Sequence, residues 1–197
     1  NQNDFEIQTP TPRARNQSPV SEIEPPPAPE SPFLSVVVNE IAWMGTKVNS
    51  ADEWIELYNN TTSTIDLNNW TLNWSHGTTT HSLTFSTSSI QANNFYLLER
   101  TASDTTDVAE DQIYTGALSN NGEKLELRDG QNNLIDLVDF SLGWPAGSST
   151  PNYISMERIN STSTATSTNW LSNNLLTRNG LDAAGNKING TPRAQNS

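Results

Sequence analysis

The sequence predicts an all-β fold, a sandwich of about eight or nine short strands that follows a disordered, proline-rich N-terminal tail. Short runs of β-branched and aromatic residues alternate with polar turns throughout the second half of the chain and most of the first. The content of Asn, Ser and Thr is high, as in sheets with one polar face and long polar connections. No stretch keeps a helical period over a useful length. This pattern favours a β-sandwich over any α/β fold.

Residues 1–34 differ from the rest of the chain because they hold eight of its eleven prolines, including Pro25-Pro26-Pro27. Such a segment has too few large apolar side chains to offset the entropy of ordering, and proline-rich chains extend. We therefore expect residues 1–34 to be a disordered, semi-rigid stalk and residues 35–197 to be the folded domain. A docking site for a proline-recognising domain is the functional alternative.

Two strands open the domain, Val36–Trp43 and Glu53–Asn59, and a polar loop joins them as a hairpin or as a pair of sandwich strands. A period of two places Ile55 and Leu57 on one face of the second run, with Trp54, Glu56 and Tyr58 on the other. Since both faces are partly apolar, this run is predicted to be a central strand.

The next strands follow in order and are separated by polar connections. In the first of them, Trp70, Leu72 and Trp74 share one face. The predicted strands are Leu67–Trp74, His81–Phe85 and Phe95–Arg100, followed after an acidic connection by the short patch Ile113-Tyr114.

Two glycine turns mark the later strands. Asn121-Gly122 predicts a tight turn, and Asp129-Gly130 predicts a hairpin, since such a pair supplies the positive φ angles of a primed turn. The strands beside the hairpin are Glu123–Arg128 and Leu134–Phe140, and Tyr153–Ile159 is predicted to be the last regular strand. We expect a mobile loop at Ser161–Thr168, after which Trp170 packs back onto the body.

Several motifs in this order resemble one known family. They are Asn39-Glu40-Ile41, the run Asp52–Asn59, Ile65–Leu72, Gly122–Gly130, Leu134–Phe140, Ser155–Arg158 and Gly190-Thr191-Pro192. The sequence from about residue 36 to 196 is similar to lamin tail domains, in particular to those of bacterial surface and secreted proteins. The resemblance implies an immunoglobulin-like sandwich and a binding or scaffolding module, because the family offers no catalytic motif to transfer. It also marks a set of structural motif residues: Asn39, Glu40, Glu53, Trp54, Glu56, Asn59 and Trp70.

Charge and composition narrow the function further. The chain has 22 acidic and 10 basic residues, a net charge of −12, and this balance argues against nucleic-acid binding. Cysteine is absent, and no apolar run approaches the roughly 20 residues of a membrane helix. Because no signal segment opens the chain, we expect a fragment or processed product whose export signal or anchor was lost upstream. The expected location is extracellular or at the cell surface, and the expected partner is a protein or a cell-wall or glycan ligand.

Aromatic and acidic residues supply the candidate binding sites. Trp74 and Trp144, beside Gly77 and Pro145, are the tryptophans predicted to be exposed for ligand stacking, and the other tryptophans are assigned to the core. The densest acidic run could hold a weak Ca²⁺ ion, although its spacing is not that of an EF-hand loop. Its alternative is a solvated charge run. The residues of this run are Asp104, Asp107, Glu110 and Asp111. No other cofactor is expected.

The chain is predicted not to be an enzyme. His76 and His81 flank a predicted turn and could share a metal, but no third ligand is placed by spacing, so two exposed loop histidines are expected. The carboxylates Glu40, Asp52, Glu53 and Glu56 could pair for acid–base work, and a structural role is favoured for them. The alternatives are an accessory targeting domain of a hydrolase- or nuclease-bearing system and a carboxylate- or metal-dependent hydrolase. A nuclear role by analogy with lamins is weaker, since the sequence has no coiled-coil heptads and no basic cluster.

Overall fold

The computed structural model describes residues 33–85 and 88–197, so the predicted stalk lies outside the described residues except for its last two. Within these ranges the chain forms twelve strands and one 3₁₀ helix, and five of the strands are only two or three residues long. The longer strands lie at the predicted places. The elements are β1 (Val36–Ala42), β2 (Trp54–Asn59), β3 (Ile65–Asp66), β4 (Thr71–His76), β5 (Thr79–Thr84), β6 (Ser89–Ile90), β7 (Phe95–Arg100), β8 (Gln112–Tyr114), β9 (Lys124–Arg128), β10 (Leu134–Asp139), β11 (Met156–Arg158), η1 (Ser167–Asn169) and β12 (Trp170–Ser172).

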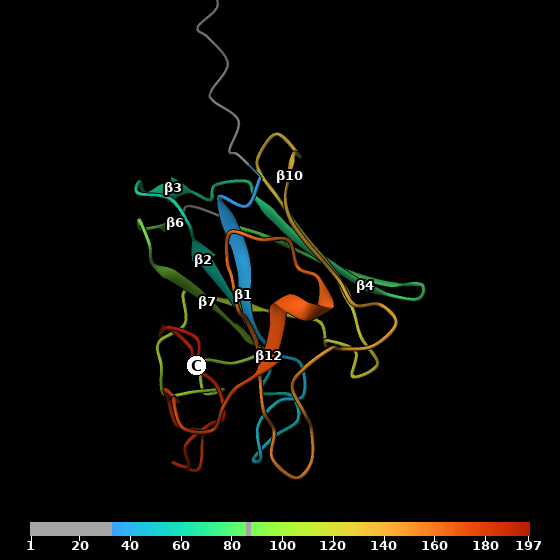
Figure 1. Ribbon diagram of the computed structural model, residues 1–197, viewed down its shortest axis with the longest axis vertical. Helices are drawn as coiled ribbons and strands as arrows, with labels where there is room; N and C mark the ends of the chain where they lie inside the picture. The colour runs from blue at the N-terminus through green and yellow to red at the C-terminus, as the bar shows by residue number, and fades with distance from the viewer. Residues whose placement is uncertain (1–32, 86–87) are drawn as a thin grey trace, which may run out of the picture.

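Two sheets build the sandwich, which confirms the predicted all-β, immunoglobulin-like fold (Figure 1). The larger sheet has the strand order β12-β11-β1-β2-β7-β8, and the smaller sheet has the order β10-β9-β4-β5. The short strands β3 and β6 pair separately. All pairs are antiparallel except β7 with β8. Strands from both ends of the described chain therefore meet at the centre of the larger sheet, where β1 lies between β2 and β11.

The prediction that β2 is a central strand is confirmed, since it pairs with β1 on one side and β7 on the other. Its inward side chains Ile55 and Leu57 are buried between the sheets. A bulge in β1 between Val38 and Glu40 shifts the register with β2 and leaves Glu40 opposite Glu56. The outward face of β1 and β2 therefore carries carboxylates at neighbouring positions.

The smaller sheet contributes the other half of the core. Leu72 and Trp74 of β4 lie opposite Leu127 and Leu125 of β9, and all four are buried. The predicted apolar face of Trp70, Leu72 and Trp74 is therefore the inner face. Alternation along the strands, with apolar side chains at every second position, explains why these runs form this layer.

The Asp129-Gly130 connection is a hairpin, as predicted, but its turn differs from the one expected. The positive φ angle, 67°, belongs to Asn132 and not to Gly130. Asp129 shapes the loop, because its Oδ1 accepts hydrogen bonds from the backbone N–H groups of Gln131 (2.9 Å) and Asn133 (2.8 Å). An Asx-type loop therefore replaces the two-residue primed turn.

The prediction that the last regular strand is Tyr153–Ile159 is wrong. That strand is shorter, β11, and β12 follows it and pairs with it through Arg158 and Trp170. Trp170 is buried, as expected, and forms part of the core.

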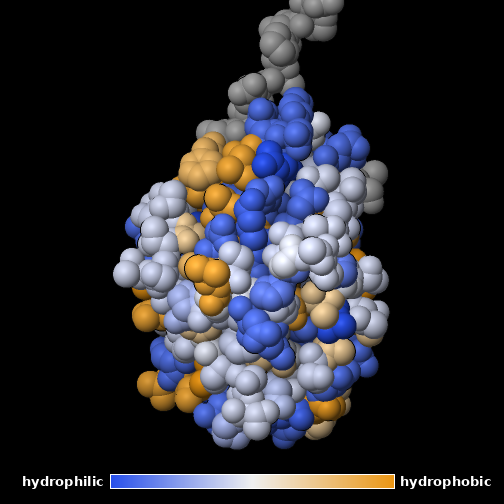
Figure 2. All heavy atoms as spheres, turned by 90° about the vertical axis from the view of Figure 1, so that its right-hand side faces the viewer, coloured by the Kyte–Doolittle hydropathy of each residue, from blue (hydrophilic) through white to orange (hydrophobic). Residues whose placement is uncertain are grey.

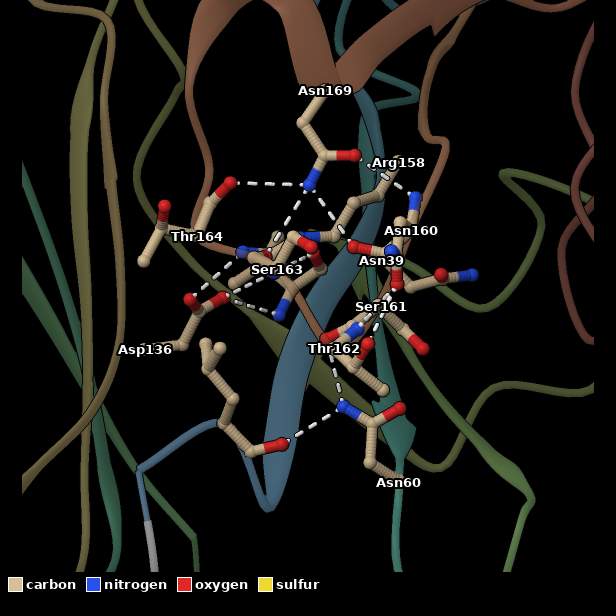
Figure 3. Close-up of polar contacts among 12 residues, drawn as sticks. Asn39, Asn60, Asp136, Arg158, Asn160, Ser161, Thr162, Ser163, Thr164 and Asn169 are labelled. Carbon is tan, nitrogen blue, oxygen red and sulfur yellow. Dashed lines mark hydrogen bonds and ion pairs between the residues drawn. The ribbon is translucent and has the colours of Figure 1, made fainter.

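One ion pair lies inside the core and joins the two sheets (Figure 3). Arg158 of β11 donates to Asp136 of β10 through two nitrogens, at 2.7 and 3.0 Å. Both side chains are fully buried. The backbone of Val38 on β1 completes the arrangement: its N–H donates to Asp136 and its carbonyl accepts from Arg158, both at 2.9 Å. The ion pair and these hydrogen bonds therefore offset part of the free energy that burying each charge costs.

The segment Ser161–Thr168, predicted to be a mobile loop, is held by one buried side chain (Figure 3). The amide nitrogen of Asn169 donates to the backbone carbonyls of Asn160 (2.9 Å), Ser163 (3.3 Å) and Thr164 (3.1 Å), and its oxygen accepts from the N–H of Asn160 at 2.9 Å. Asn60 ties the same loop to the start of the domain, since its amide donates to the carbonyls of Leu34 and Ser161, both at 2.8 Å. The described loop is thus anchored at both ends.

The side of the molecule turned toward the viewer in Figure 2 is largely hydrophilic, and its most compact apolar group lies at the end where the described chain begins. Scattered apolar side chains of this kind are normal on a folded surface. Within the described part of the chain, no helix has the length and the hydropathy required to cross a membrane.

Candidate functional site

Three glutamates stand side by side on the outer face of the larger sheet. Glu40 of β1 lies opposite Glu56 of β2 on one side and opposite Glu157 of β11 on the other. All three are buried. We call Glu56, Glu40 and Glu157 the glutamate ladder. Directly opposed antiparallel residues have Cβ atoms about 5 Å apart, so like charges at these positions repel one another.

The end of the chain covers this ladder. We call residues 189–197 the C-terminal segment. Backbone N–H groups of Thr191 and Ser197 donate to Glu40 (2.9 Å) and Glu157 (2.8 Å), and the N–H of Arg193 donates to Glu56. The segment thus bonds to each of the three carboxylates through its backbone.

Close packing at Gly190 explains why the segment can approach the sheet so tightly. A Cβ atom at this position would lie 2.5 Å from Oε1 of Glu40 and 2.5 Å from the indole carbon Cζ2 of Trp54. A larger residue would therefore lift the chain off the carboxylates.

Burial changes the acid–base behaviour of the ladder. It raises the pKa of Glu40 to about 8, with a further increase from the charge of Glu157 and a smaller opposing effect of the hydrogen bonds from Ser155 and Thr191. Burial also raises the pKa of Glu56 well above its ordinary value, with the charge of Glu40 as the second cause. The protonated form of Glu40 is therefore favoured near neutral pH, and the pKa of Glu56 is shifted in the same direction.

The other predicted carboxylates have bonds that fit a structural role. Asp52 accepts a hydrogen bond from the Thr46 hydroxyl at 2.8 Å. Glu53 accepts from Arg100 at 2.9 Å and from the N–H of Leu118 at 2.8 Å, while burial raises its pKa to about 7. Since Glu40 and Glu56 lie under the C-terminal segment, the four do not line one open cleft.

The remaining motif residues also support the fold. Asn59 donates to the carbonyls of Ser63, Ile90 and Gln91 at 2.8 to 3.1 Å and so holds the connections at the end of β2. The amide of Asn39 donates to Glu56 at 3.0 Å and to Asn196 at 3.0 Å, whereas Trp54 and Trp70 are buried in the core. The motif therefore organises the centre of the larger sheet and its attachment to the C-terminal segment.

A pocket of about 480 Å³ opens beside the C-terminal segment, in the size range of ligand sites. On one side lie the half-buried rings of Tyr58 and Phe95, tilted against each other with their centroids 5.0 Å apart. On the other side lie Ile159 and Leu171, which are 56% and 58% exposed. The polar lining residues are Asn39, Asn93, Glu157, Arg158, Ser161, Gln195, Asn196 and Ser197.

The two charged side chains in this lining are already engaged. Glu157 accepts hydrogen bonds from Asn173 (2.7 Å), Thr191 (2.9 Å) and Ser197 (2.7 and 2.8 Å). Arg158 is paired with Asp136 in the core. The pocket therefore offers apolar surface and neutral amide or hydroxyl groups to a ligand.

The predicted tryptophan site is corrected at Trp74. This side chain is only 1% exposed, because it lies on the inner face of β4, and its ring packs edge-on against Tyr114. Trp144 is half-buried: its indole N–H donates to the carbonyl of Ser119 at 2.8 Å and its ring stacks on Trp43 with centroids 6.1 Å apart. Trp74 therefore has no face available for stacking, and one face of Trp144 is covered.

The acidic run is not assembled as a metal site. Oδ1 of Asp107 accepts from the N–H of Leu181 at 2.6 Å. Oδ2 of Asp111 accepts from the N–H of Leu97 at 2.8 Å and pairs with Arg193 at 2.5 Å. Asp104 is exposed and Glu110 is half-buried. In residues 33–85 and 88–197, no three His, Asp or Glu side chains are placed to hold a metal ion, and this includes His76 and His81.

The two histidines lie on the β4–β5 hairpin, as their spacing indicates. His76 pairs with Thr79 and His81 with Trp74 in the ladder. The ring of His81 packs near that of Trp74, with centroids 5.4 Å apart. They are strand residues next to the turn of the hairpin, and both are half-buried rather than exposed as expected.

Sequence reasoning did not find the pocket because six separate segments of the chain build it. The outward position of Tyr58 on β2 was the one signal, since a half-apolar outer face on a central strand indicates that something covers or occupies it. Phe95, Leu171 and the C-terminal segment reach this face only through long-range pairing.

Comparison with known proteins gives one family. A model of the lamin tail domain family matches residues 29–141, more than half of the chain. The match ends before β11, β12 and the C-terminal segment, whereas the motif resemblance extended to residue 196. No curated protein matches the sequence.

Proposed function

Because the chain belongs to the lamin tail domain family, an immunoglobulin-like and non-enzymatic group of domains, we propose that it is a binding module of a secreted or cell-surface protein. The observation that carries this proposal is the 480 Å³ pocket next to the C-terminal segment. Its ligand is an uncharged segment of a partner protein. Residues 1–34 act as the spacer that carries the domain away from an anchor.

The lining of the pocket supports a protein ligand. Ile159 and Leu171 are each more than half exposed, and exposed aliphatic groups beside aromatic rings are common at protein interfaces. Since the charged lining residues are paired within the domain, a charged ligand would find no free counter-charge in the described lining. The net charge of −12 further disfavours nucleic acid.

A neutral glycan is the second candidate. The Tyr58–Phe95 ring pair beside the amides of Asn93 and Gln195 supports it, since sugars offer apolar C–H faces and hydroxyl groups together. In either case the domain would serve as an anchor or targeting part, including one for a hydrolase- or nuclease-bearing system.

The test is a parallel selection against a displayed peptide library and a glycan array, followed by calorimetry on each ligand. Leu171→Ser and Ile159→Ser are the pocket variants, because their exposed side chains contribute little to folding. Leu142→Ser is the matched control, since Leu142 is 102% exposed and does not line the pocket. The proposal expects at least a tenfold weaker Kd for the pocket variants and an unchanged Kd for the control.

Two outcomes would contradict the proposal. Ligands whose affinity is the same for the wild type and both pocket variants would place binding elsewhere on the domain. Enrichment of neither peptides nor glycans would leave the pocket without a function. The location is tested separately by antibody labelling of intact source cells, where labelling only after lysis would exclude the cell surface.

A further inference from the structure

The glutamate ladder concentrates negative charge where the sheet meets the C-terminal segment. Three carboxylates at neighbouring positions of β2, β1 and β11 are buried together. The nearby charged groups offset this charge only in part: Glu99 of β7 and Asp111 are acidic, and the guanidinium of Arg193, which bonds to Asp111 and to the carbonyl of Ala109, lowers the pKa of Glu56 less than burial and Glu40 raise it. Arg158 points to the core side of β11 and pairs with Asp136.

The donors that reach the ladder are neutral. Glu40 accepts from the Ser155 hydroxyl (2.5 Å) and the N–H of Thr191 (2.9 Å), and Glu56 accepts from Asn39 (3.0 Å) and the N–H of Arg193. Neutral donors do not compensate three adjacent buried negative charges. The covered arrangement therefore requires protons on the ladder.

The same segment forms one wall of the pocket through Gln195, Asn196 and Ser197. Asn196 fixes this wall by bonding to the backbone of Asn39 (3.2 Å) and of Arg158 (2.8 Å). If the segment left the ladder, the pocket would lose these three residues.

We infer that the C-terminal segment is a proton-dependent latch, which closes over the glutamate ladder when Glu40 and Glu56 are protonated, opens when they ionise, and thereby controls the pocket wall. The last part rests on the function proposed for the pocket, whereas the latch itself does not.

The direction of the effect follows from the raised pKa of Glu40, about 8 when covered against an ordinary value of 4.5. The closed form binds a proton that the open form releases above that ordinary value. For one such group, closing is strongest below about pH 4.5 and weakens by up to tenfold for each pH unit until the pKa of the covered group is reached. The latch is therefore tighter in acid and looser in mild alkali.

Amide hydrogen exchange of the full chain at pH 5, 6, 7 and 8, corrected for the intrinsic exchange rate, tests this inference without any ligand. The amides of Thr191, Arg193 and Ser197 report on the latch, and those of β2 serve as an internal reference for global opening. We expect the protection of the three reporters to fall at least tenfold from pH 5 to pH 8 and to stay below that of β2 at each pH, since global opening also becomes easier as these glutamates ionise.

Variants then identify the group responsible. Glu40→Gln keeps the shape and the acceptor but cannot ionise, so the fall in reporter protection over the same range should become smaller, and the remainder comes from Glu56, whose pKa burial also raises. Glu99→Gln is the matched control, since Glu99 is also buried but accepts its hydrogen bonds from Thr106 and not from the segment. It should behave as the wild type. If Glu40→Gln does not fold, carbon-13 NMR titration of the wild-type glutamate carboxyls identifies the titrating group instead.

The result that overturns the inference is a reporter protection that does not change with pH in the wild type, or that changes equally in Glu40→Gln. Ladder carboxyls that all titrate near their ordinary pKa in the NMR experiment would overturn it as well. A confirmed latch with no ligand in the selection experiments would refute the proposed function alone, since the exchange measurement needs no ligand. If a ligand is found, its affinity should be at least tenfold higher at pH 5 than at pH 8.

Discussion

The buried ion pair between the two sheets gives the sharpest stability prediction. Asp136→Ala removes the carboxylate from a fully buried site and leaves the Arg158 guanidinium with only the carbonyl of Val38 as a hydrogen-bond partner. Breaking a buried pair from one side costs about 3–5 kcal/mol, since the remaining charge is uncompensated. The N–H of Val38 also loses its acceptor, which adds about 1–3 kcal/mol for a buried donor.

Urea unfolding followed by fluorescence measures this change. With a slope of about 2 kcal/mol per molar urea, the smallest expected loss, about 4 kcal/mol, moves the midpoint down by about 2 M, and a larger loss moves it further. Asp139→Ala is the matched control, because Asp139 is exposed at the end of the same strand. A loss below about 1 kcal/mol for Asp136→Ala, or a loss equal to that of the control, would refute the reasoning.

A second variant separates the charge from the packing. Asp136→Leu combined with Arg158→Met replaces both charges by apolar side chains, and such replacements are often neutral or stabilising. The double variant should therefore be more stable than Asp136→Ala. If it is equally unstable, the loss came from packing at this position and not from an unpaired charge.

Three further predictions follow from the site. Because burial raises the pKa of Glu40 to about 8 and of Glu53 to about 7, the free energy of unfolding should fall as pH rises from about 4.5 to 8, on the order of 5 kcal/mol from Glu40 alone, and thermal unfolding at pH 5 and 8 measures this. Gly190→Ala places a Cβ 2.5 Å from Oε1 of Glu40 and should cost about 1–3 kcal/mol in urea unfolding; an unchanged midpoint would show that the segment is not tightly packed. Adding Ca²⁺ should leave Tm unchanged, because Asp107 and Asp111 are bonded within the domain, whereas a rise that EDTA reverses would restore the Ca²⁺ hypothesis.

The longer strands could be predicted from sequence because their signal is local. The alternation of Ile55 and Leu57 with Trp54 and Glu56 fixes which side of β2 faces the core, and the same rule places Leu72 and Trp74 inside. Trp74 was wrongly predicted to be exposed because the nearby turn residue Gly77 was given more weight than the alternation along the strand. Burial of Trp74 is what the alternation alone predicts.

The ladder could not be predicted in the same way. Each glutamate is an ordinary strand residue in its own segment, and only the pairing of β1 with β11 brings Glu157 next to Glu40 across 117 positions of sequence. Acidic side chains on the outer face of a strand are normally solvated, so no local rule marks them as buried. These glutamates are buried because residues 189–197 cover them, and those residues are distant in sequence from β1 and β2.

The same long-range pairing limits the acidic-loop prediction. Asp107 and Asp111 are close in sequence, which suggested a common site, but their hydrogen-bond donors come from different parts of the chain: Leu181 for Asp107, and Leu97 and Arg193 for Asp111. The spacing of acidic residues does not reveal hydrogen bonds that they accept from backbone N–H groups distant in sequence. A dense acidic run therefore predicts a metal site poorly when nearby loops need hydrogen-bond acceptors.

The central position of β1 has a practical consequence for anyone who wishes to express this domain. A fragment cut at residue 141, where the family match ends, would lack β11, β12 and the C-terminal segment. Such a fragment would leave one edge of β1 open to association with other chains and would expose Glu40 and Glu56. Asp136 would remain in the core without its ion-pair partner Arg158. During synthesis, too, β1 leaves the ribosome before residues 189–197, so Glu40 stays uncovered until those residues have been made.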